Sequence, residues 1–253
     1  MKFDAVYYEP AIFDYPLGRQ LREEYRDLPW IPIESHNSIR EMQEKPNDQF
    51  GHMKRNLIAG IRKTHKYVEN HKVSDYLVPY TSSGCTAMCL YCYLVCNYNK
   101  CAYLRLFVNR EQMLDRIIKK GKNSGTPLTF EIGSNSDLVL ENTITGNLLY
   151  TIPRFAEEGE GKLTFPTKFH MVEPLLDLDH RGKVIFRMSV NPQPIIRKIE
   201  LGTSGLRQRI EAVNQMCEAG YPCGLLIAPV ILVEGWKEMY TGLLEELRDG
   251  LSD

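Results

Sequence analysis

Short apolar runs recur along the chain from residue 76 onward, and stretches with a helical repeat lie between them. The first run ends at Thr81-Ser82-Ser83-Gly84, a polar turn-forming segment. Runs of this length between turns and helices are typical of strands. The predicted strands are Tyr76–Tyr80, Tyr103–Val108, Leu128–Ile132, Leu163–Pro166, Val184–Val190 and Cys223–Val230.

Helical spacing of apolar residues predicts the elements that connect these strands. Arg110 to Lys120 places Met113, Ile117 and Ile118 on one face, and Leu206, Ile210, Val213 and Cys217 form a second stripe. Because Cys217 lies on that stripe, we expect it to be a small buried apolar residue. A long third stripe runs through Trp236, Met239, Tyr240, Leu243, Leu244, Leu247 and Leu251.

Strands that alternate with helices predict an α/β fold with a parallel sheet and outer helices, in the form of a partial barrel. Chemistry in such folds lies at the carboxyl ends of the strands. The first seventy or so residues are polar and mixed, with a short helix after Pro16 and a charged, exposed stretch from Arg40 to Asp48. We therefore expect an N-terminal appendage over residues 1–72 and the partial barrel over residues 73–253.

Composition narrows the class of protein. The 253 residues suffice for one large domain or for a barrel with an appendage. The net charge of −1 argues against attraction of nucleic acid by the chain as a whole, although a local basic patch is still compatible with it. Met1–Ala5 does not begin a secretory signal, and no stretch is long and apolar enough to span a bilayer. We expect a cytoplasmic, monomeric protein without a membrane partner.

Five of the seven cysteines fall between Cys85 and Cys101, which favours metal or redox chemistry over a disulfide scaffold. Cys85, Cys89 and Cys92 have the spacing C-x3-C-x2-C, directly after the first predicted strand. Three thiolates on a [4Fe–4S] cluster leave one iron open, and S-adenosylmethionine (SAM) can chelate that iron. The alternative is a zinc loop, with Cys96 or Cys101 as a fourth ligand.

At these residues the chain resembles the spore photoproduct lyases of the radical SAM superfamily, and the resemblance covers nearly the whole chain in order. It is carried by Tyr8-Glu9-Pro10, Asp14-Tyr15-Pro16-Leu17-Gly18, Ser35-His36-Asn37, Gly60-Ile61-Arg62-Lys63-Thr64, Tyr91-Cys92-Tyr93-Leu94, Phe130-Glu131, Ser136-Asp137, Thr167-Lys168-Phe169-His170, Ser189-Val190-Asn191, Gly202-Thr203-Ser204, Ala219-Gly220-Tyr221-Pro222, Ala228-Pro229 and Glu234-Gly235-Trp236.

The resemblance implies a partial (β/α)6 barrel and repair of ultraviolet-damaged DNA in bacterial spores. The lesion is 5-thyminyl-5,6-dihydrothymine, and a 5′-deoxyadenosyl radical starts its cleavage into two thymines. The lesion has to leave the base stack to reach a buried radical. The implied partners are damaged DNA and an external electron donor such as flavodoxin or ferredoxin.

The resemblance also implies roles for individual residues. Tyr91 and Tyr93 match two tyrosines that relay a hydrogen atom, and the alternative for both is ring packing beside the cluster. Lys168 matches a lysine that contacts the SAM carboxylate. Ser136 and Ser189 match polar SAM contacts, and Ala228 matches a backbone contact to the adenine. Each of these residues also has a purely structural alternative. Lys168 would then be an exposed lysine, Ser136 a turn serine, Ser189 a buried serine and Ala228 a core alanine.

Two departures from the family pattern leave alternatives open. Ser134 stands where the family has its hydrogen-donating cysteine, and an O–H bond is too strong to replace an S–H bond in that role. Cys96, or else Cys101, is the candidate substitute donor. The family also continues into a segment with a substrate-gripping hairpin beyond the end of this sequence. The remaining basic candidates for DNA contact are Arg40, Lys54, Arg55, Arg62 and Lys63, and a solvated charged face is the alternative for the first three.

Three functions are therefore compatible with the sequence. The first is repair of the spore photoproduct, and the second is radical SAM chemistry on another substrate. The third is a non-catalytic iron–sulfur or zinc protein that has lost its donor and its grip on DNA.

Overall fold

The computed structural model describes residues 2–98 and 103–252, apart from the side chains of residues 47 and 96–98. Its helices are α1 (Pro16–Glu24), α2 (Arg40–Gln43), α3 (Phe50–Met53), α4 (Tyr93–Tyr98), α5 (Arg110–Lys122), α6 (Leu138–Thr145), α7 (Asn147–Glu158), α8 (Gln193–Ile199), α9 (Leu206–Glu218) and α10 (Trp236–Gly250). Short 3-10 helices span η1 (Pro10–Asp14), η2 (Asn47–Gln49) and η4 (Glu173–Leu175).

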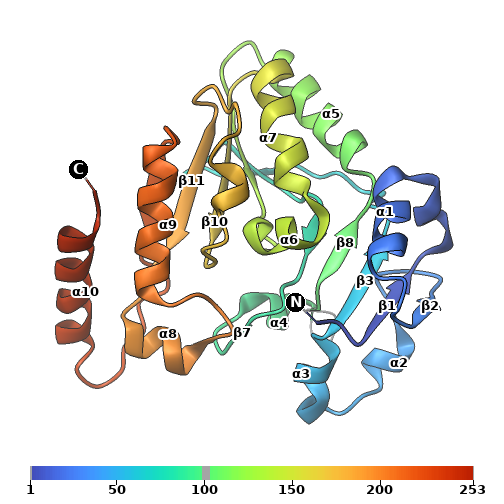
Figure 1. The fold of residues 1–253 in the computed structure, drawn as a ribbon, viewed down its shortest axis with the longest axis horizontal. Coiled ribbons are helices and arrows are strands. Elements are labelled where there is room, and N and C mark those ends of the chain that lie inside the picture. The colour runs from blue at the N-terminus through green and yellow to red at the C-terminus, as the bar shows by residue number, and fades with distance from the viewer. Residues whose placement is uncertain (1, 99–102, 253) are drawn as a thin grey trace.

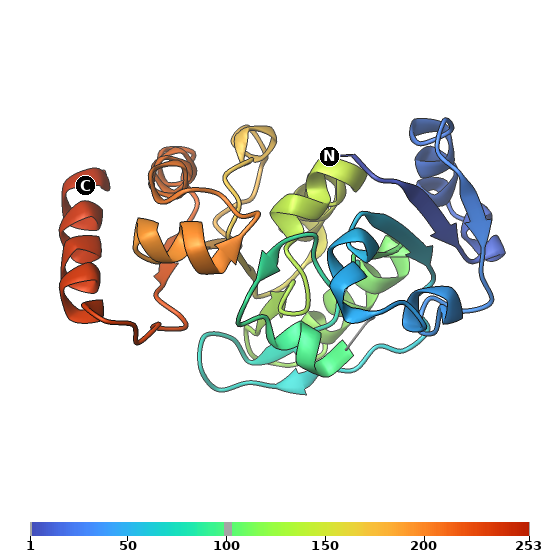
Figure 2. The ribbon, with the colours of Figure 1, turned by 90° about the horizontal axis from the view of Figure 1, so that it is seen from below.

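The strands are β1 (Ala5–Tyr8), β2 (Trp30–Pro32), β3 (Asn56–Gly60), β4 (Val68–Glu69), β5 (Tyr76–Val78), β6 (Ser82–Ser83), β7 (Met88–Cys89), β8 (Arg105–Phe107), β9 (Thr129–Ile132), β10 (Lys162–Thr167), β11 (Val184–Ser189), β12 (Glu200–Leu201) and β13 (Cys223–Leu226). In the described ranges they form sheets of order β2-β1-β3-β8-β6 and β13-β11-β10-β9-β5-β4, and β12 pairs with β7. Figure 1 shows the N-terminal strands at one end of the molecule and α10 at the other, and Figure 2 shows the same separation from below.

A continuous series of strands connects the two large sheets. β8 pairs with β6, residues 79–81 link β6 to β5, and β5 pairs with β9. The series continues through β10, β11 and β13, whose neighbours are all parallel. These sheets stay open, so the α/β fold and partial barrel predicted from the sequence are confirmed.

The N-terminal residues join this series directly. β3 pairs in parallel with β8, with Ile58 opposite Arg105 and Gly60 opposite Phe107. β1 and β2 extend the same sheet outward. The boundary at residue 72 stays a prediction, but the segment before it shares backbone hydrogen bonds with β8.

Local sequence signals account for the ends of the elements near the barrel mouth. The Asp137 carboxylate accepts a hydrogen bond of 3.2 Å from the Leu140 amide and so caps α6. Gly146 ends α6 in the left-handed conformation, with a φ of 60°, which glycine adopts without steric cost. β13 ends at Leu226, before the predicted end at Val230, and Pro229 has no amide hydrogen to donate to a ladder beyond that point.

Buried side chains from strands and helices form the main core, in which Phe130, Phe165 and Phe186 of the strands meet Phe155 of α7 and Met216 of α9. The prediction for Cys217 is wrong, because this residue of α9 is exposed. Within residues 2–98 and 103–252, no helix has the length and apolar character needed to span a bilayer.

Candidate active site

The carboxyl ends of β9, β10 and β11 open onto one cavity of about 210 Å³. Parallel strands bring these ends to the same edge of the sheet, which places residues from distant parts of the chain around one space. The predicted site residues that line it are Cys85, Cys89, Tyr91, Cys92, Tyr93, Ser136, Lys168 and Ser189. The cysteine loop lies across the cavity from the strand ends.

The cysteine loop is fixed by pairing with a segment more than one hundred residues further along the chain. β7 pairs antiparallel with β12, which places Cys89 opposite Glu200 and Met88 opposite Leu201. The Leu90 amide also donates to the Ile199 carbonyl at 2.9 Å. Cys89 is therefore held in place by backbone hydrogen bonds between two strands and does not lie in an unpaired loop.

The thiols in this loop are poor acids as they stand. Burial raises the pKa of Cys85 to about 12 and that of Cys89 to about 11. Both stay protonated near neutral pH unless a metal takes the place of the proton.

The donor set fits a cluster held by three cysteines. In the described part of the chain, no three His, Cys, Asp or Glu side chains are grouped so as to hold a single metal ion. A cubane cluster takes one thiolate at each of several iron corners, so its ligands surround a volume and do not meet at one point. Cys85, Cys89 and Cys92 face one cavity in this way.

Lys54 lies beneath the same loop and is only 3% exposed. Its ammonium group donates hydrogen bonds of 2.8 Å to the carbonyl oxygens of Cys85 and Ala87. The expectation of Lys54 as a DNA contact or a solvated charge is wrong, because the residue is buried against the loop.

The two predicted relay tyrosines make different contacts. The Tyr91 hydroxyl donates to the Glu200 carboxylate, and the Lys168 ammonium lies 5.8 Å from the centre of the Tyr91 ring. Burial and this hydrogen bond raise the pKa of Tyr91 above its ordinary value. The Tyr93 hydroxyl donates to the backbone carbonyl of Ser134, and 53% of Tyr93 is exposed. Both rings line the cavity.

Glu200 is the centre of a buried network behind Tyr91. Arg209 donates to its carboxylate at 2.6 Å, and both side chains are fully buried. Burial alone would raise the pKa of Glu200, but the Arg209 guanidinium and the Tyr91 hydroxyl hold it below its ordinary value. Arg209 also donates to the Ser189 carbonyl at 2.8 Å and so ties the end of β11 to this network.

Asp137 organises the opposite wall. It accepts hydrogen bonds from the Lys168 amide at 2.9 Å and from the Thr167 hydroxyl at 2.8 Å, besides capping α6. Burial raises the pKa of Asp137, although these donors act in the opposite direction. One carboxylate therefore fixes the turn that presents Lys168 and the helix that follows Ser136.

Ser136 connects to a second buried carboxylate. Its hydroxyl lies 2.7 Å from that of Ser82, which in turn lies 2.5 Å from the Glu141 carboxylate. The Ser82 hydroxyl carries one hydrogen, so it donates either to the Glu141 carboxylate or to the Ser136 hydroxyl. Ser136 itself lines the cavity.

The other predicted residues have separate placements. Ser134 lines the cavity, at the turn after β9. Ala228 is exposed, two residues beyond Leu226, which pairs with Ser189. Cys96 lies within α4, and its side chain, like all of Cys101, is outside the described residues.

The remaining basic candidates are not among the residues that line the cavity at the cysteine loop. Arg40 and Arg55 are exposed and pair with Glu44 and Asp4. Arg62 donates to the Tyr80 carbonyl at 2.9 Å, and its guanidinium lies 3.9 Å from the centre of the Phe107 ring. Arg62 and Lys63 line a separate polar cavity of about 340 Å³ with Glu9, Glu34, Ser35, His36, Asn37 and Thr64.

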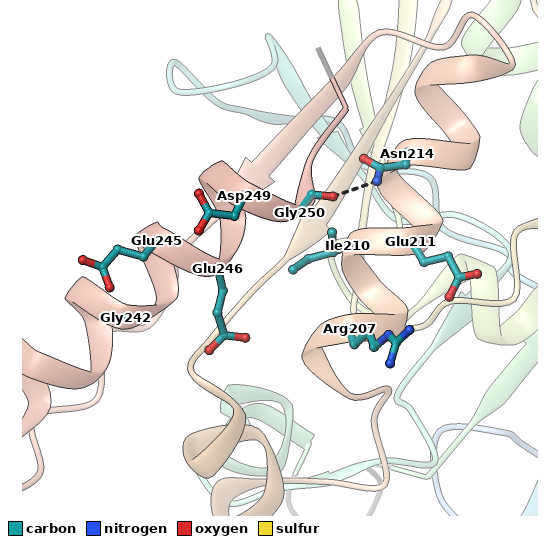
Figure 3. Close-up of a pocket in the computed structure, with 9 residues that line it drawn as sticks. All are labelled: Arg207, Ile210, Glu211, Asn214, Gly242, Glu245, Glu246, Asp249 and Gly250. Atoms are coloured by element: carbon teal, nitrogen blue, oxygen red, sulfur yellow. Dashed lines mark hydrogen bonds between the residues drawn. The ribbon is translucent and has the colours of Figure 1, made fainter.

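A wider groove of about 840 Å³ lies between α9 and α10. Figure 3 shows Asn214 of α9 donating to the Gly250 carbonyl of α10, with Glu245, Glu246 and Asp249 along α10. This groove is lined by acidic side chains of two surface helices and by one arginine, without a cysteine, a histidine or a tyrosine. The smaller cavity therefore remains the candidate active site.

Comparison with known proteins decides the family. The sequence model of spore photoproduct lyase matches residues 1–253. The chain belongs to the spore photoproduct lyase family. This confirms the family resemblance seen in the sequence.

Curated spore photoproduct lyases are similar along almost all of this chain. The protein of Bacillus subtilis (strain 168) is 39% identical over 247 residues, which are 96% of this chain and 72% of that protein. The Geobacillus protein (strain Y412MC61) is 33% identical, again over 96% of this chain and 72% of that protein. The protein of Clostridium acetobutylicum is 31% identical over 99% of this chain and 75% of its own length.

Solved structures of spore photoproduct lyase are also similar. A double mutant with bound AdoMet and dinucleoside spore photoproduct superposes with a TM-score of 0.91 at 31% identity, over 98% of this chain and 74% of that one. A complex with dinucleoside spore photoproduct has a TM-score of 0.89 over the same shares.

Sequence reasoning missed three residues of this spore photoproduct lyase site. Lys54 and Glu200 come from segments without a motif of their own, so no local signal marks them. Asp137 had a readable signal, since an Asp before an apolar run is a typical helix cap. Its second role at Lys168 depends on the fold.

Proposed function

We propose that this chain reverses the spore photoproduct in DNA, splitting the methylene-bridged lesion into two thymines. The observation that carries the proposal is the convergence of Cys85, Cys89 and Cys92 with the tyrosine pair and Lys168 around one cavity at the strand ends. Membership of the spore photoproduct lyase family supports the reaction class.

The proposed cofactors are a [4Fe–4S] cluster on Cys85, Cys89 and Cys92 and a molecule of SAM beside it. When bound, the reduced cluster supplies the electron that cleaves SAM to a 5′-deoxyadenosyl radical. The Lys168 ammonium is assigned to the SAM carboxylate, and the position of Lys168 in the cavity lining, directly after β10, supports this assignment. Ser136, which follows β9, and Ser189, at the end of β11, are assigned to polar contacts with SAM, and the Ala228 backbone is assigned to the adenine.

The protein's own residues then control the fate of the substrate radical. Tyr91 and Tyr93 line the cavity between the cysteine loop and the turn at Ser134, which suits a relay of a hydrogen atom. Ser134 holds its O–H bond too strongly to quench a thymine methyl radical. The proposed donor is therefore the Cys96 thiol, with Cys101 as the second candidate.

The proposed partners follow from this chemistry. The substrate is ultraviolet-damaged DNA, and the cluster needs an external one-electron donor such as flavodoxin or ferredoxin. We further propose that the protein acts as a monomer in the cytoplasm of the bacterial spore.

An anaerobic assay tests the function. Protein reconstituted with iron and sulfide is given SAM, dithionite and dinucleoside spore photoproduct, and both 5′-deoxyadenosine and repaired thymine are measured. We expect both products. Deoxyadenosine without repaired thymine would indicate a radical SAM enzyme with another substrate, and the absence of both would indicate a non-catalytic protein.

A further inference from the structure

Lys54 reaches from the end of α3 to the backbone of the cysteine loop. It follows Met53 directly as the C-terminal cap of the helix, and its ammonium nitrogen lies 5.4 Å from the centre of the Phe50 ring. Its ammonium group ends between the carbonyl oxygens of Cys85 and Ala87, each at 2.8 Å. A Cβ added to Gly51 of α3 would lie 4.0 Å from the Met88 side chain, so α3 lies beside this loop.

The charge of Lys54 is compensated in an unusual way. A buried ammonium group is costly unless it is paired with an opposite charge. In the part of the chain that the structure describes, no Asp or Glu forms an ion pair with Lys54, and its hydrogen-bond acceptors are neutral carbonyls.

The cysteines become the counter-charge once they are ligands. Three thiolates on a [4Fe–4S] core leave the assembly with a net negative charge, and reduction adds one more electron to it. A nearby cation stabilises the more negative, reduced state more strongly than the oxidised state. Net charge and hydrogen bonding around the ligands are among the factors that set the potential of such clusters.

We propose that Lys54 is a positioning residue of the cluster site, whose ammonium group fixes the Cys85–Ala87 backbone and whose positive charge favours the reduced cluster. This role rests on the proposed function, because it requires the cluster at Cys85, Cys89 and Cys92. If Lys54 only held the loop in place, its hydrogen bonds to the Cys85 and Ala87 carbonyls would be sufficient and its charge would not matter. The proposal adds a charge requirement that can be measured separately.

The test compares three variants with the wild-type protein after anaerobic reconstitution. Lys54→Met keeps the length and apolar stem of the side chain but removes the charge, and Lys54→Arg keeps the charge. Lys45→Met is the matched control, since Lys45 pairs with Glu41 at 3.8 Å and lies in the same N-terminal segment. For each protein we would measure iron content, the cluster's midpoint potential by electron paramagnetic resonance, and the melting temperature without metal.

We expect Lys54→Met to hold less iron and to shift the midpoint potential of the remaining cluster to a more negative value. Lys54→Arg should return the potential toward that of the wild type, and Lys45→Met should leave it unchanged. A Met variant without any cluster still supports the proposal if the Arg variant retains one.

Two results would overturn the role of Lys54 while leaving the proposed function intact. One is a fully loaded Lys54→Met protein with the wild-type potential. The other is equal loss of the cluster from the Met and Arg variants, which would show that shape alone matters. A wild-type protein that takes up no cluster would instead overturn the proposed function, and the role of Lys54 with it.

Discussion

The Tyr93 hydroxyl donates a hydrogen bond to the backbone carbonyl of Ser134, which joins the start of α4 to the turn after β9. Both residues line the cavity. The side chain at position 134 is therefore next to a tyrosine that the family resemblance assigns to hydrogen transfer. A thiol placed at this position would be adjacent to both the cavity and the relay.

Ser134→Cys should raise the share of repaired thymine among the reaction products. A thiol gives up its hydrogen atom to a carbon radical far more easily than an alcohol does, so fewer radicals should end as trapped adducts. Product analysis by liquid chromatography and mass spectrometry checks this, with Ser124→Cys as the control. Ser124 bonds to Gly121 and Thr126 and is not among the residues lining the cavity.

The native donor is tested by Cys96→Ala and Cys101→Ala, made separately. Loss of the donor should leave SAM cleavage intact while diverting the thymine radical into adducts. Wild-type yields of repaired thymine in both variants would show that neither cysteine is the donor. An unchanged product pattern in Ser134→Cys would show that the radical does not wait beside position 134.

Replacing any one of Cys85, Cys89 or Cys92 by Ala should abolish cluster loading and SAM cleavage, because each is assigned one iron–sulfur bond. Iron and sulfide analysis after anaerobic preparation measures this directly. Cys217→Ala is the control, because Cys217 is exposed on α9 and should leave the iron content unchanged. Full iron content in Cys89→Ala would contradict the ligand assignment.

The strand pattern could be predicted because buried strands leave continuous apolar runs that end at polar turns. α6 and α7 could not be predicted in the same way. α6 is buried on nearly all sides, including Glu141, so no polar face marks its repeat. α7 contains Pro153, a residue that ordinarily argues against a helix interior.

The cysteine ligands could be predicted because all three lie in one short motif. Their supports could not, since Lys54 and Glu200 are 31 and 111 positions from Cys85 and Cys89 and meet the loop through tertiary contacts alone. Cys217 shows the opposite failure. Its spacing fits an apolar stripe, but the end of that stripe on α9 faces solvent.

Lys168→Ala should weaken SAM binding by about 1.5–3 kcal/mol, roughly one to two powers of ten in Kd, because a charge-assisted contact to the carboxylate is lost. Equilibrium dialysis with SAM measures the change. Lys162→Ala is a matched control at the other end of β10, where the lysine is exposed. Equal Kd values for Lys168→Ala and wild type would remove Lys168 from the SAM site.

Glu141 should make the free energy of unfolding fall as the pH rises. Burial raises its pKa from 4.5 to about 7, so the folded state binds this proton more tightly than the unfolded state does. The stabilisation is therefore present below pH 4.5 and lost as the pH approaches 7. A shift of this size corresponds to roughly 3 kcal/mol.

Glu141→Gln removes this titration, so its stability relative to wild type should improve steadily between pH 4.5 and 7. Denaturant unfolding at several pH values checks the trend. Glu157→Gln, at an exposed position on α7, should follow the wild-type curve. Parallel curves for Glu141→Gln and wild type would contradict the raised pKa.

Arg209→Met should lower the free energy of unfolding by about 3–5 kcal/mol, because it leaves the fully buried Glu200 carboxylate without its cation. Thermal melting of the protein without metal measures the loss. The double variant Arg209→Met/Glu200→Gln should melt above the single variant, since it removes the stranded charge. A double variant that is less stable by the sum of both single effects would show that the pair is not coupled.

The pairing of β7 with β12 has a consequence for the order in which the protein is made. A ribosome releases the N-terminal part of a chain first, so the loop at Cys85–Cys92 emerges well before Glu200 and Arg209 exist. Until those residues arrive, the loop lacks both its partner strand and the buried anion behind Tyr91. We therefore expect iron insertion to be a late, post-translational event that acts on an almost finished fold.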